Sequence, residues 1–210
     1  MSQRHSPRPA QGQTDRLPLA GGLALRRGRA HLALGPSRHA FAGLLMARSA
    51  GAVVWIGAEA ARDRLHAAGL RSFADPGRLV LAEAGDGAAL LWALKAALRS
   101  GAAPLVVADL PDRPPAVDWA DLGLAAATAR PAPLGLVLAA HAPDGTGAPD
   151  SAWRLAPVPA PGPDMALAAG AGQPDPHWRL DRLHAPDGPP ARWSAVGDAA
   201  GRVDLTPLPG

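Results

Sequence analysis

The sequence of 210 residues has no cysteine and no tyrosine, and it contains a single lysine, Lys95. The absence of cysteine excludes a disulfide scaffold, a thiolate-ligated zinc site and a cysteine nucleophile. Only 4% of the residues are aromatic and 19% are charged, whereas 48% are hydrophobic. That hydrophobic share excludes a charge-dominated disordered chain. The length suits one compact domain with a tail.

Long uninterrupted hydrophobic runs are also missing. Lys95 and Arg99 interrupt the apolar stretch around residues 90–98, and Arg130 with two prolines interrupts the one around residues 122–140. Neither stretch reaches bilayer length, and the first residues lack the apolar core of a signal peptide. We therefore expect a protein without a membrane segment, located in the cytoplasm.

Positive charge is concentrated near the N-terminus. Residues 1–38 contain seven arginines and one acidic residue, Asp15, whereas the whole chain has a formal net charge of only +3. Such an arm can contact nucleic acid or an acidic partner, or it can be a solvated tail. We predict that residues 1–17 are a disordered basic arm, and both interpretations of its charge stay open. The seven arginines are Arg4, Arg8, Arg16, Arg26, Arg27, Arg29 and Arg38.

Apolar runs of strand length alternate with helical patterns through the first two thirds of the chain. The expected strands are residues 31–34, 52–56, 78–81, 104–108 and 134–139. A first helix is expected from Ser37, which can cap it. Further helices are expected at residues 59–68, 86–100 and 118–129. Continuous apolar strands separated by helices predict an α/β fold with a mainly parallel sheet covered on both faces.

The pattern changes after residue 142. Short strand-like segments at residues 153–155, 177–180 and 192–195 are separated by turns rich in Pro and Gly. We interpret them as C-terminal antiparallel strands that extend the sheet. The expected organisation is a single domain over residues 18–205 with a flexible loop at 157–172, followed by a tail at 206–210.

The turn after the first strand is where a phosphate-binding loop would lie. Such a loop needs glycines that let backbone N–H groups approach a phosphate, a lysine for the outer phosphates and a hydroxyl for the metal. Here the loop contains Gly35, Pro36, Ser37, Arg38 and His39, while Phe41 and Ala42 stand at the lysine and hydroxyl positions. The loop is therefore degenerate, although a helix N-terminus with Arg38 still attracts an anion weakly.

Two acidic residues follow apolar strands at the edge where such sites form. Asp109 stands where a magnesium-binding acid would be, and Glu59 where a carboxylate would activate water. Both have structural alternatives, as a turn residue and as a first-turn helix acid respectively. Without the lysine and the hydroxyl we regard Glu59 and Asp109 as vestigial, and we expect no catalytic residue and no cofactor.

Histidine and tryptophan give weaker signals. The seven histidines show no metal-ligand spacing, so we expect no metal site. Trp153, Trp178 and Trp193 each lie in a short strand-like segment beside arginine or serine. They favour core packing over a binding surface.

The order of these segments resembles the ATPase core of RecA-like recombinases. The matching residues are Gly28-Arg29, Gly35-Pro36, Gly57-Ala58-Glu59 and Val106-Val107-Ala108-Asp109. More specifically, residues 17–205 resemble the ImuA family of RecA-related accessory proteins. The motifs behind this resemblance are LPLAGG at 17–22, VWI at 54–56, LWAL at 91–94 with LRSG at 98–101, WRLAP at 153–157 and WRL at 178–180.

The resemblance implies a role in SOS-induced mutagenesis, in which such proteins assist error-prone translesion DNA synthesis. The implied partners are an ImuB-like inactive relative of Y-family polymerases and an error-prone C-family DNA polymerase, with RecA as a further candidate. We expect a non-catalytic adaptor whose own contact with DNA is weak. A residual nucleotide-dependent ATPase and a SulA-like inhibitor of cell division are the alternatives.

Overall fold

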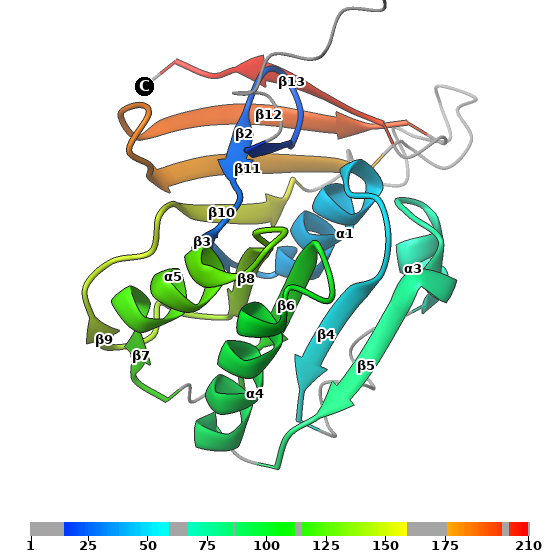
Figure 1. Cartoon of the computed structure of the whole chain (residues 1–210). Helices are drawn as coiled ribbons and strands as arrows, with labels where there is room; N and C mark the ends of the chain where they lie inside the picture. Colours follow the sequence, from blue (N-terminus) through cyan, green and yellow to red (C-terminus); the bar gives the residue numbers. More distant parts are fainter. Residues whose placement is uncertain are drawn as a thin grey trace, which may run out of the picture.

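The structure is a computed structural model of the chain, and it describes residues 15–58, 67–85, 87–111, 115–158, 176–198 and 202–209. A nine-stranded sheet runs through the molecule (Figure 1), in the order β13-β12-β11-β10-β3-β8-β6-β4-β5. The strands are β3 (Arg29–Leu34), β4 (Val53–Gly57), β5 (Leu79–Glu83), β6 (Leu105–Asp109), β8 (Leu134–Ala139), β10 (Ala152–Pro157), β11 (His177–His184), β12 (Ala191–Gly197) and β13 (Val203–Pro207).

The six strands from β10 to β5 are parallel to one another, whereas β10, β11, β12 and β13 are joined by antiparallel pairings. The sequence prediction of a mainly parallel sheet with C-terminal antiparallel strands is confirmed. One detail differs, because β10 belongs to both parts of the sheet. It lies parallel to β3 and antiparallel to β11, so the antiparallel extension starts one strand later than expected.

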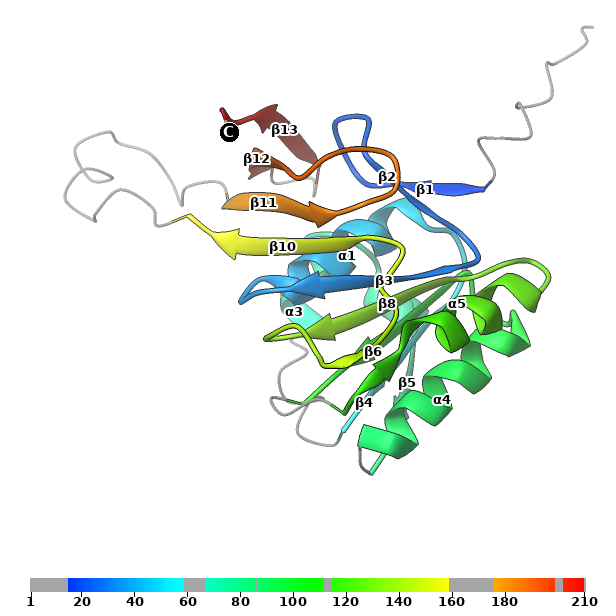
Figure 2. The ribbon, with the colours of Figure 1, turned by 90° about the vertical axis from the view of Figure 1, so that its left-hand side faces the viewer.

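Helices cover both faces of the sheet (Figures 1 and 2). Helix α1 (Arg38–Arg48) packs on one face, while α4 (Gly87–Ser100) and α5 (Trp119–Thr128) pack on the other. The short α3 (Ala67–Arg71) and the 3-10 turn η1 (Pro76–Arg78) precede β5. Strands buried on both faces need side chains that are apolar at every position, which explains the continuous runs in β6 and β8.

Two small sheets were not predicted. A hairpin joins β1 (Arg16–Pro18) to β2 (Ala24–Arg26), and β7 (Val117–Asp118) pairs with β9 (Gly145–Thr146). The hairpin belongs to the folded body, because the side chains of Leu17 and Leu25 are each only 1% exposed. The last residues of the predicted arm are thus ordered, and β13 likewise runs two residues past the expected end of the domain.

The boundaries of the predicted elements need two further corrections. Gly69 does not end a helix, because α3 continues through it to Arg71. Ser37 precedes α1 but makes no side-chain capping hydrogen bond. Residues 159–175, which include most of the predicted loop, lie outside the described residues, while Pro157 belongs to β10.

The tryptophans predicted to pack in the core do so. Trp153 and Trp178 are 2% and 8% exposed, and Trp193 packs against the same cluster of buried side chains. Trp92 behaves differently, because 69% of its surface on α4 is exposed. No helix in the described ranges is long and apolar enough to span a lipid bilayer.

Candidate functional site

The alternation of side chains along β6 directs Asp109 toward α1. Leu105 and Val107 pack into the core on the α1 face, and Val106 and Ala108 pack into the core on the opposite face. Asp109, two residues after Val107, therefore lies on the α1 side of the carboxyl edge of the sheet. It is completely buried, so its carboxyl group needs partners from the protein.

Those partners come from the first turn of α1. His39 Nε2 donates a hydrogen bond to Asp109 Oδ2 over 2.8 Å, and Arg38 Nε lies 3.8 Å from Asp109 Oδ1. The Arg38 side chain is itself buried, and its Nη1 donates to the carbonyl of Gly35. The predicted loop residues and the predicted acid are thus brought together, although β8 separates β3 from β6 in the sheet.

The imidazole of His39 has a second contact, with Trp55 of β4. The two rings stack with centroids 6.0 Å apart and planes inclined by 16°. Three buried side-chain atoms here have no hydrogen-bond partner among the described residues, namely Arg38 Nε, Trp55 Nε1 and Asp109 Oδ1. We define Arg38, His39, Trp55 and Asp109 as the Asp109 corner.

The loop that leads into α1 is shaped by β10. Gly35 has a φ of +93°, and a Cβ atom there would lie 2.7 Å from the carbonyl oxygen of Leu155. The same oxygen accepts a hydrogen bond from the Ser37 amide, and the Arg38 amide donates to the Gly35 carbonyl. A glycine is required here by the close approach of β10, and the Ser37 and Arg38 amides are already occupied within the protein.

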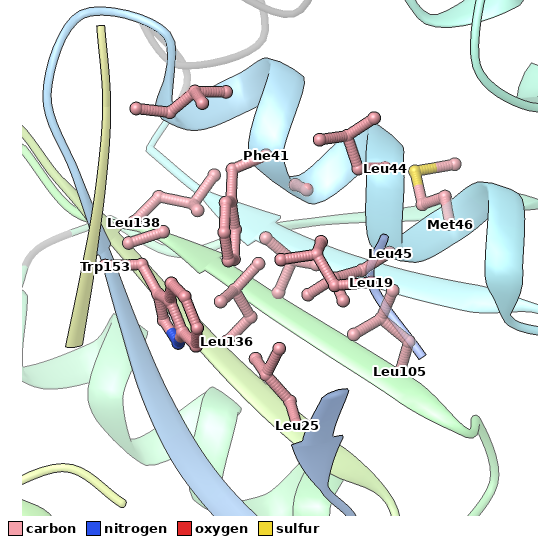
Figure 3. Packing of buried hydrophobic residues seen from close by; sticks show 14 of the residues in the cluster. Leu19, Leu25, Phe41, Leu44, Leu45, Met46, Leu105, Leu136, Leu138 and Trp153 are labelled. Atoms are coloured by element: carbon pink, nitrogen blue, oxygen red, sulfur yellow. The ribbon is translucent and has the colours of Figure 1, made fainter. Parts of the chain in front are cut away.

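The two residues predicted to stand at the lysine and hydroxyl positions of a phosphate loop are buried in the hydrophobic core. Phe41 and Ala42 are both 0% exposed. Figure 3 shows Phe41 extending from α1 toward Leu136, Leu138 and Trp153, and its ring centroid lies 6.0 Å from that of Trp153. Neither position presents a group to a nucleotide, so the corner has an acid and an arginine but no lysine for a triphosphate.

The remaining predicted site residues are less informative. Glu59 lies outside the described residues, and Pro36 contributes no amide N–H to the loop. Within the described ranges, no group of three or more His, Asp, Glu or Cys side chains could hold a metal ion.

A second polar cluster, which the sequence did not reveal, surrounds His31 on β3. Trp153 Nε1 donates to Ser151 Oγ over 2.7 Å, and Ser151 Oγ lies 2.8 Å from His31 Nδ1. The His31 Nε2–H donates to the carbonyl of Arg26, which leaves Nδ1 to accept from the serine hydroxyl. Burial lowers the pKa of His31, although the hydrogen bond to Arg26 and the charge of Asp150 oppose that shift.

The His31 cluster is structural, although Asp150 lies 3.9 Å from the imidazole in an arrangement of Ser, His and Asp. His31 and Ser151 are 0% and 4% exposed, and the adjoining cavity has a volume of only about 10 Å³. No substrate fits beside the serine hydroxyl. Only the sequence neighbours of His31, which are apolar on both sides, pointed to its burial.

Comparisons with known proteins identify no family: no family model matches the chain, and no curated protein matches its sequence.

Proposed function

We propose that the protein is a non-catalytic, RecA-like adaptor in a complex that performs mutagenic translesion DNA synthesis in the bacterial cytoplasm. The proposal starts from the resemblance of residues 17–205 to the ImuA family. The observation that carries its non-catalytic part is the hydrogen bond between His39 Nε2 and Asp109 Oδ2. An acid that binds magnesium in a nucleotide site directs its oxygens to the metal and its waters, whereas Oδ2 of this carboxylate is already hydrogen-bonded to the protein.

The burial of Phe41 supports the same proposal. An ATPase of the phosphate-loop type neutralises the charge that develops on the transferred phosphoryl group with lysine and magnesium. Phe41 occupies the lysine position and packs between α1 and the sheet. Its replacement by lysine would place a charge in the core, so this part of the fold serves stability.

One observation favours the second candidate, a residual nucleotide-dependent enzyme. In the part of the chain that the structure describes, Asp109 Oδ1 and Arg38 Nε are buried without hydrogen-bond partners, and Trp55 Nε1 beside them also lacks one. Buried polar atoms of this kind are rare in native proteins and occur at ligand sites. A nucleotide phosphate would accept hydrogen bonds from Arg38 Nε and Trp55 Nε1, and a magnesium ion would bind Asp109 Oδ1.

Co-purification tests the proposal. The purified chain is mixed at micromolar concentration with an ImuB-like protein, and size-exclusion chromatography is run with and without MgATP. An active Y-family polymerase serves as the matched control. The adaptor predicts a stable complex with the ImuB-like protein alone, unchanged by MgATP. Absence of a complex contradicts the adaptor, and a complex that forms only with MgATP favours the second candidate.

A further inference from the structure

Five arginines line one groove at the end of the sheet opposite the Asp109 corner. The groove has a volume of about 530 Å³, and Asp15 is the only acidic residue among the described residues that line it. Its arginines come from the β1–β2 hairpin, from the turn into β3 and from the residues after α5, at the end where β2 leads into β3 (Figure 2). We call it the arginine groove, lined by Arg16, Arg26, Arg27, Arg29 and Arg130.

Two of these arginines are neutralised by carboxylates. Arg16 Nη1 lies 2.5 Å from Asp187 Oδ2, and Arg26 forms a bidentate ion pair with the carboxylate of Asp150. The hydrogen bond from Arg16 lowers the pKa of Asp187, as expected for a stable ion pair. These pairs hold Arg16 and Arg26 side by side, since the two residues face each other in the β1–β2 hairpin.

Arg27 and Arg130 are different, because within the described ranges they have only carbonyl partners. Arg27 Nη1 donates to the carbonyl of Pro104, and Arg130 Nη1 donates to the carbonyls of Ala127 and Ala129. These bonds position each guanidinium group through one nitrogen and neutralise no charge. The other N–H groups remain for an anion, and a guanidinium group binds two oxygens of a phosphate at once.

Arg29 connects the groove to a neighbouring hollow. Its Nε lies 3.8 Å from Asp150 Oδ1, a carboxylate that Arg26 already binds, so its charge is only partly compensated. The hollow shares Arg29 and Ala127 with the groove and has a volume of about 390 Å³. Apolar residues of α5 line much of it, including Leu124 and Trp119, which is 5% exposed, and the Asp150 carboxylate lies at its border with Arg29. Leu124 is 60% exposed.

We propose that the arginine groove binds the phosphodiester backbone of single-stranded DNA, with bases placed in the adjoining hollow on α5. A chain of phosphates supplies the negative charge that Arg27, Arg29 and Arg130 lack, and the unpaired bases supply apolar faces for the hollow. A duplex keeps its bases stacked inside, so it uses the groove without the hollow. The choice of DNA over RNA rests on the proposed function, whereas the assignment of the groove as a site for a phosphodiester backbone does not.

The charge of Arg27 supports this assignment. Burial lowers the pKa of Arg27 because its guanidinium group has lost water without gaining a carboxylate. A phosphate bound at Nε or Nη2 would compensate that loss. In the sequence before Asp15, residues 1–14 contain Arg4 and Arg8 and no acidic residue.

Binding of a fluorescent 15-nucleotide oligo(dT), followed by anisotropy at several salt concentrations, tests the proposal. The double variant Arg27→Ala/Arg130→Ala is expected to bind at least about tenfold more weakly, because each arginine loses a charge-assisted bond. The slope of log affinity against log salt should fall by about 1.4 for two lost phosphate contacts on a single strand. Arg71→Ala, which removes an exposed arginine on α3, is the matched control and should bind like the unaltered protein.

The charge-preserving variant Arg27→Lys/Arg130→Lys separates binding from folding. It should retain the salt slope of the unaltered protein while losing affinity. Lysine keeps the positive charge but cannot bind two phosphate oxygens at once as the guanidinium group does. The proposal is overturned if oligo(dT) is not bound at low salt, if the alanine double variant binds equally well, or if a duplex or an oligo(U) of equal length binds more tightly. A negative result leaves the association with the ImuB-like protein unaffected, so the two proposals fail separately.

Discussion

His39 Nε2 and Asp109 Oδ2 lie 2.8 Å apart, joining the first turn of α1 to the end of β6 across 70 residues of sequence. The imidazole stacks on Trp55, and the carboxylate is completely buried. A buried acid held by a histidine and an arginine stabilises the junction between helix and sheet. The same contact engages the acid that a phosphate-loop enzyme would use for its metal.

Removing the charge of Asp109 should destabilise the fold. Asp109→Asn leaves Arg38 buried without a carboxylate and weakens the bond to His39, so we expect a loss of about 1.5–3 kcal/mol in the free energy of unfolding. Urea unfolding followed by tryptophan fluorescence measures this loss. Asp204→Asn on β13 is the control, because Asp204 is exposed, and equal unfolding midpoints for the two variants would contradict the role of Asp109.

The aromatic residue at the lysine position should matter for stability. Phe41→Ala removes a side chain that is 0% exposed, and we expect a loss of about 3–5 kcal/mol. Trp92→Ala removes a larger side chain that is 69% exposed and should change the free energy of unfolding by about 0.5 kcal/mol or less. Thermal or urea unfolding of both variants makes the comparison. A small loss of stability in Phe41→Ala would contradict the role of Phe41 in packing α1 against the sheet.

Gly35 should be sensitive to a single methyl group. Gly35→Ala adds a Cβ at a φ of +93° and within 2.7 Å of the Leu155 carbonyl oxygen. Gly22→Ala is the matched control, because Gly22 has a φ of +81° with no atom within 4 Å of the added Cβ. We expect Gly35→Ala to cost about 1–3 kcal/mol more than Gly22→Ala in urea unfolding. Equal losses in the free energy of unfolding for the two variants would show that β10 can shift away from the Cβ added at residue 35.

Stability should fall in mildly acidic solution because of His31. Burial lowers the pKa of His31 in the folded protein, so below pH of about 6.5 the unfolded chain binds a proton that the folded chain does not. The free energy of unfolding then decreases as the pH falls, by at most about 1.4 kcal/mol per pH unit for one group. The pKa of Asp187 is also lowered, by its hydrogen bond to Arg16, but that group acts in a more acidic window.

The variant His31→Gln isolates this effect. Its free energy of unfolding, measured in urea between pH 7 and pH 5, should be lower at pH 7 but should change less with pH than that of the unaltered protein. Parallel profiles for the two proteins would show that another group causes the dependence.

Local sequence patterns were sufficient for five of the six parallel strands and for the helices α1, α4 and α5. Every residue of β8, and of β6 as far as Ala108, is apolar because both faces of these strands are covered, and that feature is visible in the sequence. The pairing of β10 was not predictable, because a strand of six residues carries no mark of which neighbour it joins. The hairpin of β1 and β2 was missed because each of its strands has only three residues, too few to show the alternation that marks a strand.

The candidate site was predictable in its residues and not in its contacts. The sequence identified Arg38, His39 and Asp109 through their positions beside strands, but a hydrogen bond over 70 residues depends on the order of the strands. The arginine groove was harder to foresee, because Arg130 follows α5 and meets Arg27 only in the folded chain. Arg16 was predicted to belong to the disordered arm of residues 1–17, whereas it lies in β1 on the folded body, beside Arg26 of β2.

The hydrolysis of MgATP by the purified chain tests the central claim most directly. Phosphate release at micromolar protein should equal that of buffer alone, and it should be the same in Glu59→Gln and Asp109→Asn. Turnover well above background that both substitutions abolish would show that the Asp109 corner is a working nucleotide site, and it would contradict the non-catalytic adaptor.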